Sequence, residues 1–231
     1  MNNRKPTAVI IGIGPGNGAA ISRQFAEQGY NVAMISRSTT LSSQLAASFD
    51  HAKAYAADAN HPDSIVAALD AVVLEYGSVD TLVYNAGAGS WAKATDTRLD
   101  DFESSWRVNA LSALAAAQAV APAMVSEGHG NIVFIGATAS LRGGLNTTGF
   151  AAGKAAQRSM AQSLSKELSP KGVHVALVII DGQVDAEAVA GQQLDDKLNP
   201  HDIAHAIFQI TRQPTSAQSF QVELRPKNES W

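Results

Sequence analysis

The chain has 231 residues, 45% of them hydrophobic and 16% charged, which is enough to bury the core of one domain without disulfides or metals. Its formal net charge of −4 argues against a basic surface for nucleic acid. Its lack of any cysteine excludes disulfides, thiolate metal sites and a cysteine nucleophile. No apolar run approaches the length of a membrane span, and no secretory signal is recognisable, so we expect one cytoplasmic domain over residues 1–231, with no metal, nucleic-acid or membrane partner.

Short apolar segments alternate with helical patterns along the whole chain. The apolar segments are rich in Val and Ile and alternate little, which is typical of strands buried on both faces; they are 8–11, 32–35, 52–56, 81–84, 131–135, 173–180 and 220–224. The helical patterns between them are 17–28, 41–49, 62–75, 99–127, 148–168 and 200–212. This order predicts a Rossmann-type, doubly wound α/β fold with helices on both faces of a mostly parallel seven-stranded sheet, ordered 3-2-1-4-5-6-7.

A glycine-rich turn joins the first predicted strand to the first predicted helix. Its residues are Gly12, Gly14, Gly16, Asn17 and Gly18. Glycines permit a tight turn and a close approach of the backbone to a pyrophosphate, and a helix N-terminus attracts phosphate groups. The turn therefore predicts a dinucleotide site, although the same glycines could pack helix against strand without a ligand.

A second ligand class, S-adenosylmethionine, uses a similar turn. The Gly-Pro-Gly core at 14–16 is similar to that of methyltransferases. Those sites usually carry an acid two positions before the first glycine and another at the end of the second strand. This chain has Ile10 and Ser36 there, so a methyltransferase is the weaker alternative.

The end of the second predicted strand bears on the choice between NAD and NADP. An acid at this position would bind the free ribose hydroxyls of NAD. The chain instead has Ser36 followed by Arg37, and a guanidinium binds a 2′-phosphate in a fork. We therefore expect NADP, with NAD as the other possibility and a solvated Arg37 as the plain structural reading.

Several later motifs, taken with the turn, resemble the short-chain dehydrogenase/reductase family over residues 7–224. They are Asp58 with Ala59 after the third strand, Asn85-Ala86-Gly87 after the fourth, Asn109 on a helix, Lys154, and Asp181-Gly182 where most members have Pro-Gly. The resemblance implies that Asp58 lies by the adenine, that Lys154 reaches the nicotinamide ribose, and that Val184 also contacts the cofactor. It further implies a homodimer or homotetramer.

The catalytic positions depart from that family. Its active members place a Tyr four residues before the Lys and a Ser thirteen residues before the Tyr. This chain has Phe150 and Ala137 there, which leaves Lys154 and Asn109 as the catalytic residues that the resemblance implies. A phenyl ring cannot exchange a proton. The chain resembles a subgroup of the family in which Phe replaces the Tyr and the Lys is kept.

Each of these motifs also has a plain structural interpretation. Asp58 could cap the helix that begins near Pro62, and the Asn85 amide could bridge two strand ends. Asn109 could bond a local carbonyl, and Lys154 could be solvated.

Two nearby residues could replace the missing proton donor. Thr138 follows Ala137, but adjacent strand positions face opposite ways, so we do not expect Thr138 to substitute for the serine. Asp181 could act as an acid if partly buried, but an Asp-Gly turn in which Asp181 bonds its own backbone is the preferred interpretation.

We therefore expect an NADP(H)-dependent oxidoreductase that transfers a hydride to or from a small carbonyl or alcohol, with a degenerate active site. The alternative is an inactive NADP(H)-binding sensor or scaffold.

Overall fold

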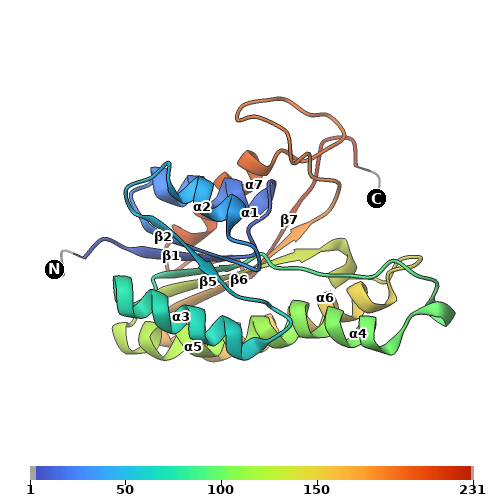
Figure 1. Ribbon diagram of the computed structural model, residues 1–231, viewed down its shortest axis with the longest axis horizontal. Helices are drawn as coiled ribbons and strands as arrows, with labels where there is room; N and C mark the ends of the chain where they lie inside the picture. Colours follow the sequence, from blue (N-terminus) through green and yellow to red (C-terminus); the bar gives the residue numbers. More distant parts are fainter. Residues whose placement is uncertain (1–3, 230–231) are drawn as a thin grey trace.

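A single parallel sheet organises the molecule. The computed structural model describes residues 4–229. Its strands are β1 Thr7–Ile11, β2 Asn31–Ser36, β3 Ala52–Ala56, β4 Thr81–Tyr84, β5 Gly130–Ala137, β6 Val173–Ile180 and β7 Gln221–Leu224. Every neighbouring pair is parallel, in the order β3-β2-β1-β4-β5-β6-β7 (Figure 1). This confirms the predicted fold and strand order, with β5 running two residues further than predicted.

Helices cover both faces of the sheet. They are α1 Asn17–Glu27, α2 Thr40–Ala46, α3 Pro62–Tyr76, α4 Leu99–Trp106, α5 Ser112–Glu127, α6 Thr148–Leu168 and α7 Pro200–Thr211. Figure 1 shows α1, α2 and α7 on one face and α3, α4, α5 and α6 on the other. The helix predicted at 41–49 ends earlier, at Ala46.

Each central strand contributes side chains to two separate hydrophobic cores, one on each face of the sheet. In β1, Val9 and Ile11 pack towards α3 and α5, whereas Ala8 and Ile10 pack towards α1 and α7. All four side chains are at most 2% exposed. A strand buried on both faces needs apolar residues at every position, which explains why the sequence shows apolar runs in place of alternation.

The predicted helix at 99–127 is interrupted by one wider turn. Residues Arg107–Leu111 form a π-helical segment between α4 and α5, and Asn109 lies in it. A π segment inserts an extra residue into a helix and often occurs at functional sites. Val108, Asn109 and Ala110 are buried in this segment.

The same long helix corrects one expectation from the sequence. By length and composition alone, Leu99–Glu127 could cross a membrane. Much of its apolar character comes from alanines. In the structure half of its most apolar stretch is buried inside the protein, and Ala113, Ala116 and Ala117 are fully buried against the sheet. A helix that packs in a protein core can have this length and composition.

Candidate functional site

A cavity of about 380 Å³ lies at the carboxyl ends of β1, β2 and β4. Its walls come from the glycine turn, the loop after β3 and the π segment. The structure brings nine predicted residues together here: Gly12, Gly14, Ser36, Arg37, Asp58, Ala59, Asn85, Ala86 and Gly87. Ser104 and Val108 also line it and were not predicted. Ligands bind at this edge in open α/β sheets, because parallel strands end there together.

The glycine turn fits closely against the end of β4. Gly12 has a φ of +98°, and a Cβ there would lie 2.5 Å from the Ala86 backbone nitrogen. A Cβ on Gly18 would lie 2.3 Å from the Gly12 carbonyl oxygen. The Asn85 side-chain amide donates to that same oxygen at 2.6 Å, so Asn85 does bridge two strand ends.

The start of α1 lies beside the turn but outside the lining of this cavity. Within the described chain no side chain caps α1, which leaves its first N–H groups for water or a ligand. The Asn17 side-chain oxygen is buried without a hydrogen-bond partner in residues 4–229. The loop after β6 covers the turn from above (orange in Figure 1), with Val184 and Ala186 within 4 Å of a Cβ built on Gly16.

Ser36 and Arg37 differ sharply in their surroundings. The Ser36 hydroxyl donates to the Ser38 carbonyl at 2.9 Å and lies 3.1 Å from the Ser42 hydroxyl. Arg37 is exposed at the cavity wall, with no hydrogen bond or ion pair to any of residues 4–229. Its guanidinium is therefore free to meet an anion in the cavity.

Asp58 does not cap α3, so that interpretation is wrong. Its carboxylate accepts from the Asn60 backbone N–H at 3.0 Å, and its own N–H donates to the Ser64 hydroxyl at 3.1 Å. The N-cap position of α3 is His61. Asp58 lies too far ahead of the helix to cap it and closes a local turn beside the cavity.

Lys154 is buried, so the interpretation as a solvated lysine is wrong. The residue is 4% exposed, and its ammonium donates to the Ile135 carbonyl at 2.7 Å and to the Gln157 side-chain oxygen at 3.4 Å. Burial lowers the pKa of Lys154 to about 8. Gln157 was not predicted; its position three residues after Lys154 on one helix was the available signal.

Hydrogen bonds of the Gln157 side chain connect Asn109 to Lys154, and both residues lie beside Gly87. The Gln157 amide donates to the Asn109 carbonyl at 2.9 Å. The Asn109 amide donates to the Ala88 carbonyl at 2.6 Å and to the Ser105 carbonyl at 2.8 Å, so it does bond local carbonyls. A Cβ on Gly87 would lie 3.4 Å from the Asn109 side-chain oxygen and 3.6 Å from the Lys154 nitrogen. Three separated motifs therefore converge on one point.

Phe150 lies between Lys154 and a second cavity. Its ring centroid is 6.0 Å from the Lys154 nitrogen and 5.0 Å from the Trp91 ring, which it meets edge to face. The second cavity, of about 510 Å³, is mainly apolar and is lined by Trp91, Ala137, Thr138, Ala139, Arg142, Gly143, Gly144, Thr147, Phe150, Ile180 and Gly182. Trp91 is 66% exposed and forms the rim.

The structure corrects both interpretations of the possible proton donors. β5 ends at Ala137 and Thr138 begins a 3₁₀ turn, Thr138–Ser140, so strand alternation no longer applies and both residues line the second cavity. The Asp181 carboxylate does not bond its own backbone. It accepts from the Thr138 hydroxyl and forms an ion pair with Arg225, which follows β7.

The buried lysine should make stability depend on pH. Between the folded pKa of about 8 and the ordinary value of 10.5, the unfolded chain binds the lysine proton and the folded chain does not. The free energy of unfolding therefore rises with pH in this window. Relative to Lys154→Met, we expect the parent to gain about 1 kcal/mol between pH 7 and pH 9 in urea titrations. An unchanged difference between the two proteins would contradict a strongly desolvated ammonium.

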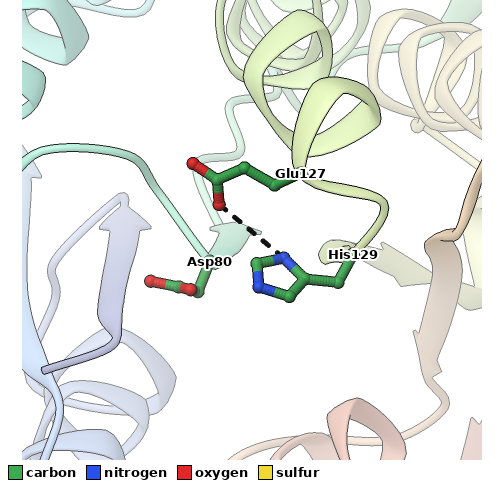
Figure 2. Close-up of side chains that lie close together, drawn as sticks. All are labelled: Asp80, Glu127 and His129. Carbon is green, nitrogen blue, oxygen red and sulfur yellow. Dashed lines mark ion pairs between the residues drawn. The ribbon is translucent and has the colours of Figure 1, made fainter. Parts of the chain in front are cut away.

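A separate cluster of titratable groups lies at the opposite end of the sheet. Figure 2 shows Asp80, Glu127 and His129 within 4.8 Å of one another. The Arg4 guanidinium contacts Asp80 at 3.0 Å and Glu127 at 4.0 Å, and the Thr7 backbone N–H donates to Asp80 at 2.7 Å. The carboxylates already have cationic and N–H partners, and these contacts tie β1, β4 and α5 together.

A parallel sheet with a glycine turn after its first strand and a cavity across its strand ends defines a nucleotide-binding Rossmann protein. The sequence profile of the short-chain dehydrogenases matches residues 6–196. The chain therefore belongs to the short-chain dehydrogenase/reductase family of oxidoreductases.

Known proteins of similar sequence and structure agree with this assignment. An uncharacterized oxidoreductase of Staphylococcus aureus is 30% identical over 225 residues, which cover 95% of this chain and 96% of that protein. A short-chain dehydrogenase from Rhodopseudomonas palustris superposes with a TM-score of 0.84 at 30% identity, over 96% of this chain and 99% of that one. A metagenomic short-chain oxidoreductase in complex with NADP gives a TM-score of 0.83 at 25% identity, over 96% and 98%.

Proposed function

We propose that this protein is an NADP(H)-dependent oxidoreductase that transfers a hydride between the nicotinamide and a small carbonyl or alcohol, with a degenerate active site. The observation that carries the proposal is the cavity that joins the glycine turn to Arg37, Asp58 and Asn85. Its polar groups come from three strand ends and suit a phosphate-bearing nucleotide.

The preference for NADP rests on Arg37. Its guanidinium lies at the cavity wall with no partner in residues 4–229, and Ser36 puts no negative charge beside it. A 2′-phosphate would supply the missing partner through charge-assisted hydrogen bonds. The metagenomic relative solved with NADP agrees with this choice of cofactor.

Arg37→Gln should weaken NADPH binding by about tenfold and leave NADH binding unchanged, because only the 2′-phosphate distinguishes the two cofactors. Fluorescence titration of both cofactors measures this, with Arg212→Gln, an exposed arginine outside the cavity, as the control. A parent that binds NADH as tightly as NADPH would contradict the preference for NADP. Binding of S-adenosylmethionine alone would overturn the whole proposal in favour of the methyltransferase.

A degenerate active site would make the reaction slow. A bound cofactor would supply the hydride to a carbonyl or take it from an alcohol, and the protein would orient the cofactor. Lys154, beside Gly87, would hold the nicotinamide ribose, and Asn85, which bonds the Gly12 carbonyl, would hold the glycine turn in place. Phe150 occupies the position at which an active member would hold the proton donor. Loss of a positioned acid lowers a rate by about 10²–10⁴, so we propose slow turnover.

The alternative of an NADP(H)-binding sensor or scaffold is favoured by one observation. The Lys154 ammonium is already held by the Ile135 carbonyl and the Gln157 amide oxygen, and its neighbour is a phenyl ring. A screen of carbonyl compounds with NADPH separates the two candidates. Cofactor binding without turnover across the screen would favour the sensor.

A further inference from the structure

Two threonines, Thr138 and Thr147, line the apolar cavity beside Phe150, and the Thr147 hydroxyl already donates to the Gly144 carbonyl and accepts from the Gly144 backbone N–H, both at 2.9 Å. Thr138 lines this cavity together with Ala137 and Phe150. The family resemblance implies that active members carry catalytic hydroxyls at these two positions. The apolar side chains that line the cavity include Trp91 and Ile180. The charged side chain of the lining, Arg142, is exposed, and Thr138 carries the hydroxyl that is left for a polar group of a ligand beside Phe150.

The hydrogen-bond direction at Thr138 is fixed by its neighbours. The hydroxyl donates to one oxygen of Asp181, and Arg225 donates to the other oxygen. Asp181 is 5% exposed and forms an ion pair with Arg225, and a carboxylate can only accept. A threonine hydroxyl has a single proton. Because that proton is held by Asp181, Thr138 is left with lone pairs and can only accept from a ligand.

The acceptor positions of Thr138 are unused by the protein. No group in the described part of the chain donates to its hydroxyl oxygen, whereas both oxygens of Asp181 have partners. A ligand that donates would complete the set. A carbonyl, which has no proton to give, could bond Thr138 only by taking the proton that Asp181 holds, and one oxygen of that buried carboxylate would then lose its partner, which costs free energy.

We propose that Thr138 is a specificity-determining residue that accepts a hydrogen bond from the substrate, so that the cavity selects small apolar alcohols over the corresponding ketones. The inference rests on the proposed function for its setting, because the cavity adjoins Phe150 and Lys154. It adds that the alcohol is the better-bound member of the substrate pair. Asp181 acts through Thr138 as a positioning residue, and Arg225 holds Asp181.

A purely structural role for these residues predicts a different result. The ion pair between Asp181 and Arg225 would then only attach the segment after β7 to the end of β6. Changes at Thr138 would alter stability and leave the alcohol-to-ketone preference unchanged. The ratio of the dissociation constants of the alcohol and the ketone therefore distinguishes the two roles. A general weakening of binding changes both constants by the same factor and leaves the ratio unchanged.

Calorimetric titration with matched probes tests the proposal. Cyclohexanol and cyclohexanone, and 1-phenylethanol and acetophenone, are titrated into the protein saturated with NADP⁺. We expect the parent to bind each alcohol about tenfold more tightly than its ketone, the value of one net hydrogen bond. Thr138→Val should reduce the ratio to about one, and Thr138→Ser should keep it, since only the serine retains the hydroxyl.

Asp181→Asn provides the sharpest test. Arg225 is a donor and would hold the amide oxygen, which turns the amide N–H₂ towards Thr138. The threonine proton is then released for a ligand, and the preference should move towards the ketone. If Thr138→Val does not fold by circular dichroism, Thr138→Ala takes its place beside Asp181→Asn.

Three outcomes would overturn the inference: equal or tighter binding of the ketone by the parent, a preference that survives Thr138→Val, and no binding of any probe. The failure of the proposed function is seen separately, in the preceding titration with NADPH. The direction of the Thr138 hydrogen bond does not depend on the cofactor. A protein that does not bind NADPH must therefore still show the alcohol preference in its unloaded form.

Discussion

The double variant Phe150→Tyr, Ala137→Ser is expected to reduce carbonyl compounds about 10²–10⁴ times faster than the parent. A tyrosine at 150 would place its phenol on the same face of α6 as Lys154, whose ammonium lies 6.0 Å from the present ring centroid. A positive charge at this distance favours the phenolate and so prepares the phenol to exchange a proton. A serine at 137 would add a hydrogen-bond donor to the same cavity wall.

The rate of NADPH oxidation, followed by absorbance over a panel of aldehydes and ketones, measures this gain. Phe150→Leu is the matched control, because it removes the ring and adds no acid. Its rate should equal that of the parent. If the double variant binds NADPH but remains as slow as the parent, the missing phenol and hydroxyl do not limit the reaction.

The fold and one half of the site could be predicted because both follow from local sequence. Uninterrupted apolar runs identified strands buried on both faces, and their alternation with helices fixed the strand order. The strand ends then brought Gly12, Arg37, Asp58 and Asn85 to one cavity without any knowledge of side-chain contacts. Residues that directly follow parallel strands meet at the same edge of the sheet.

The other half of the site depends on contacts between distant segments. Gln157 bonds a carbonyl 48 residues away, and Asp181 is held by Arg225, 44 residues further along the chain. The π segment at Asn109 left no trace in the helical periodicity. The side of the chain to which the Thr138 side chain points depended on the residue at which β5 ends. The boundaries of an element are its least predictable feature.

Gly18 carries the second large expected effect, because the glycine turn holds the proposed cofactor site together. Alanine is normally about 1 kcal/mol better than glycine inside a helix. Here its Cβ would lie 2.3 Å from the Gly12 carbonyl oxygen and 2.8 Å from the Ile13 Cα, and both are backbone atoms. The Gly12 carbonyl is also fixed by Asn85 at 2.6 Å, so the turn cannot move aside cheaply.

We therefore expect Gly18→Ala to lower the free energy of unfolding by about 2 kcal/mol, since overpacking outweighs the gain in helix propensity. If NADPH binding must restore the displaced turn at a similar cost, its affinity falls about 30-fold. Gly14→Ala is the matched control for stability, because a Cβ on Gly14 has no atom within 4 Å. Urea unfolding and NADPH titration measure the two effects. Equal stability of the two variants would mean that the turn accommodates an added methyl group. The close packing of Gly12 on Gly18 would then not determine the geometry of this site.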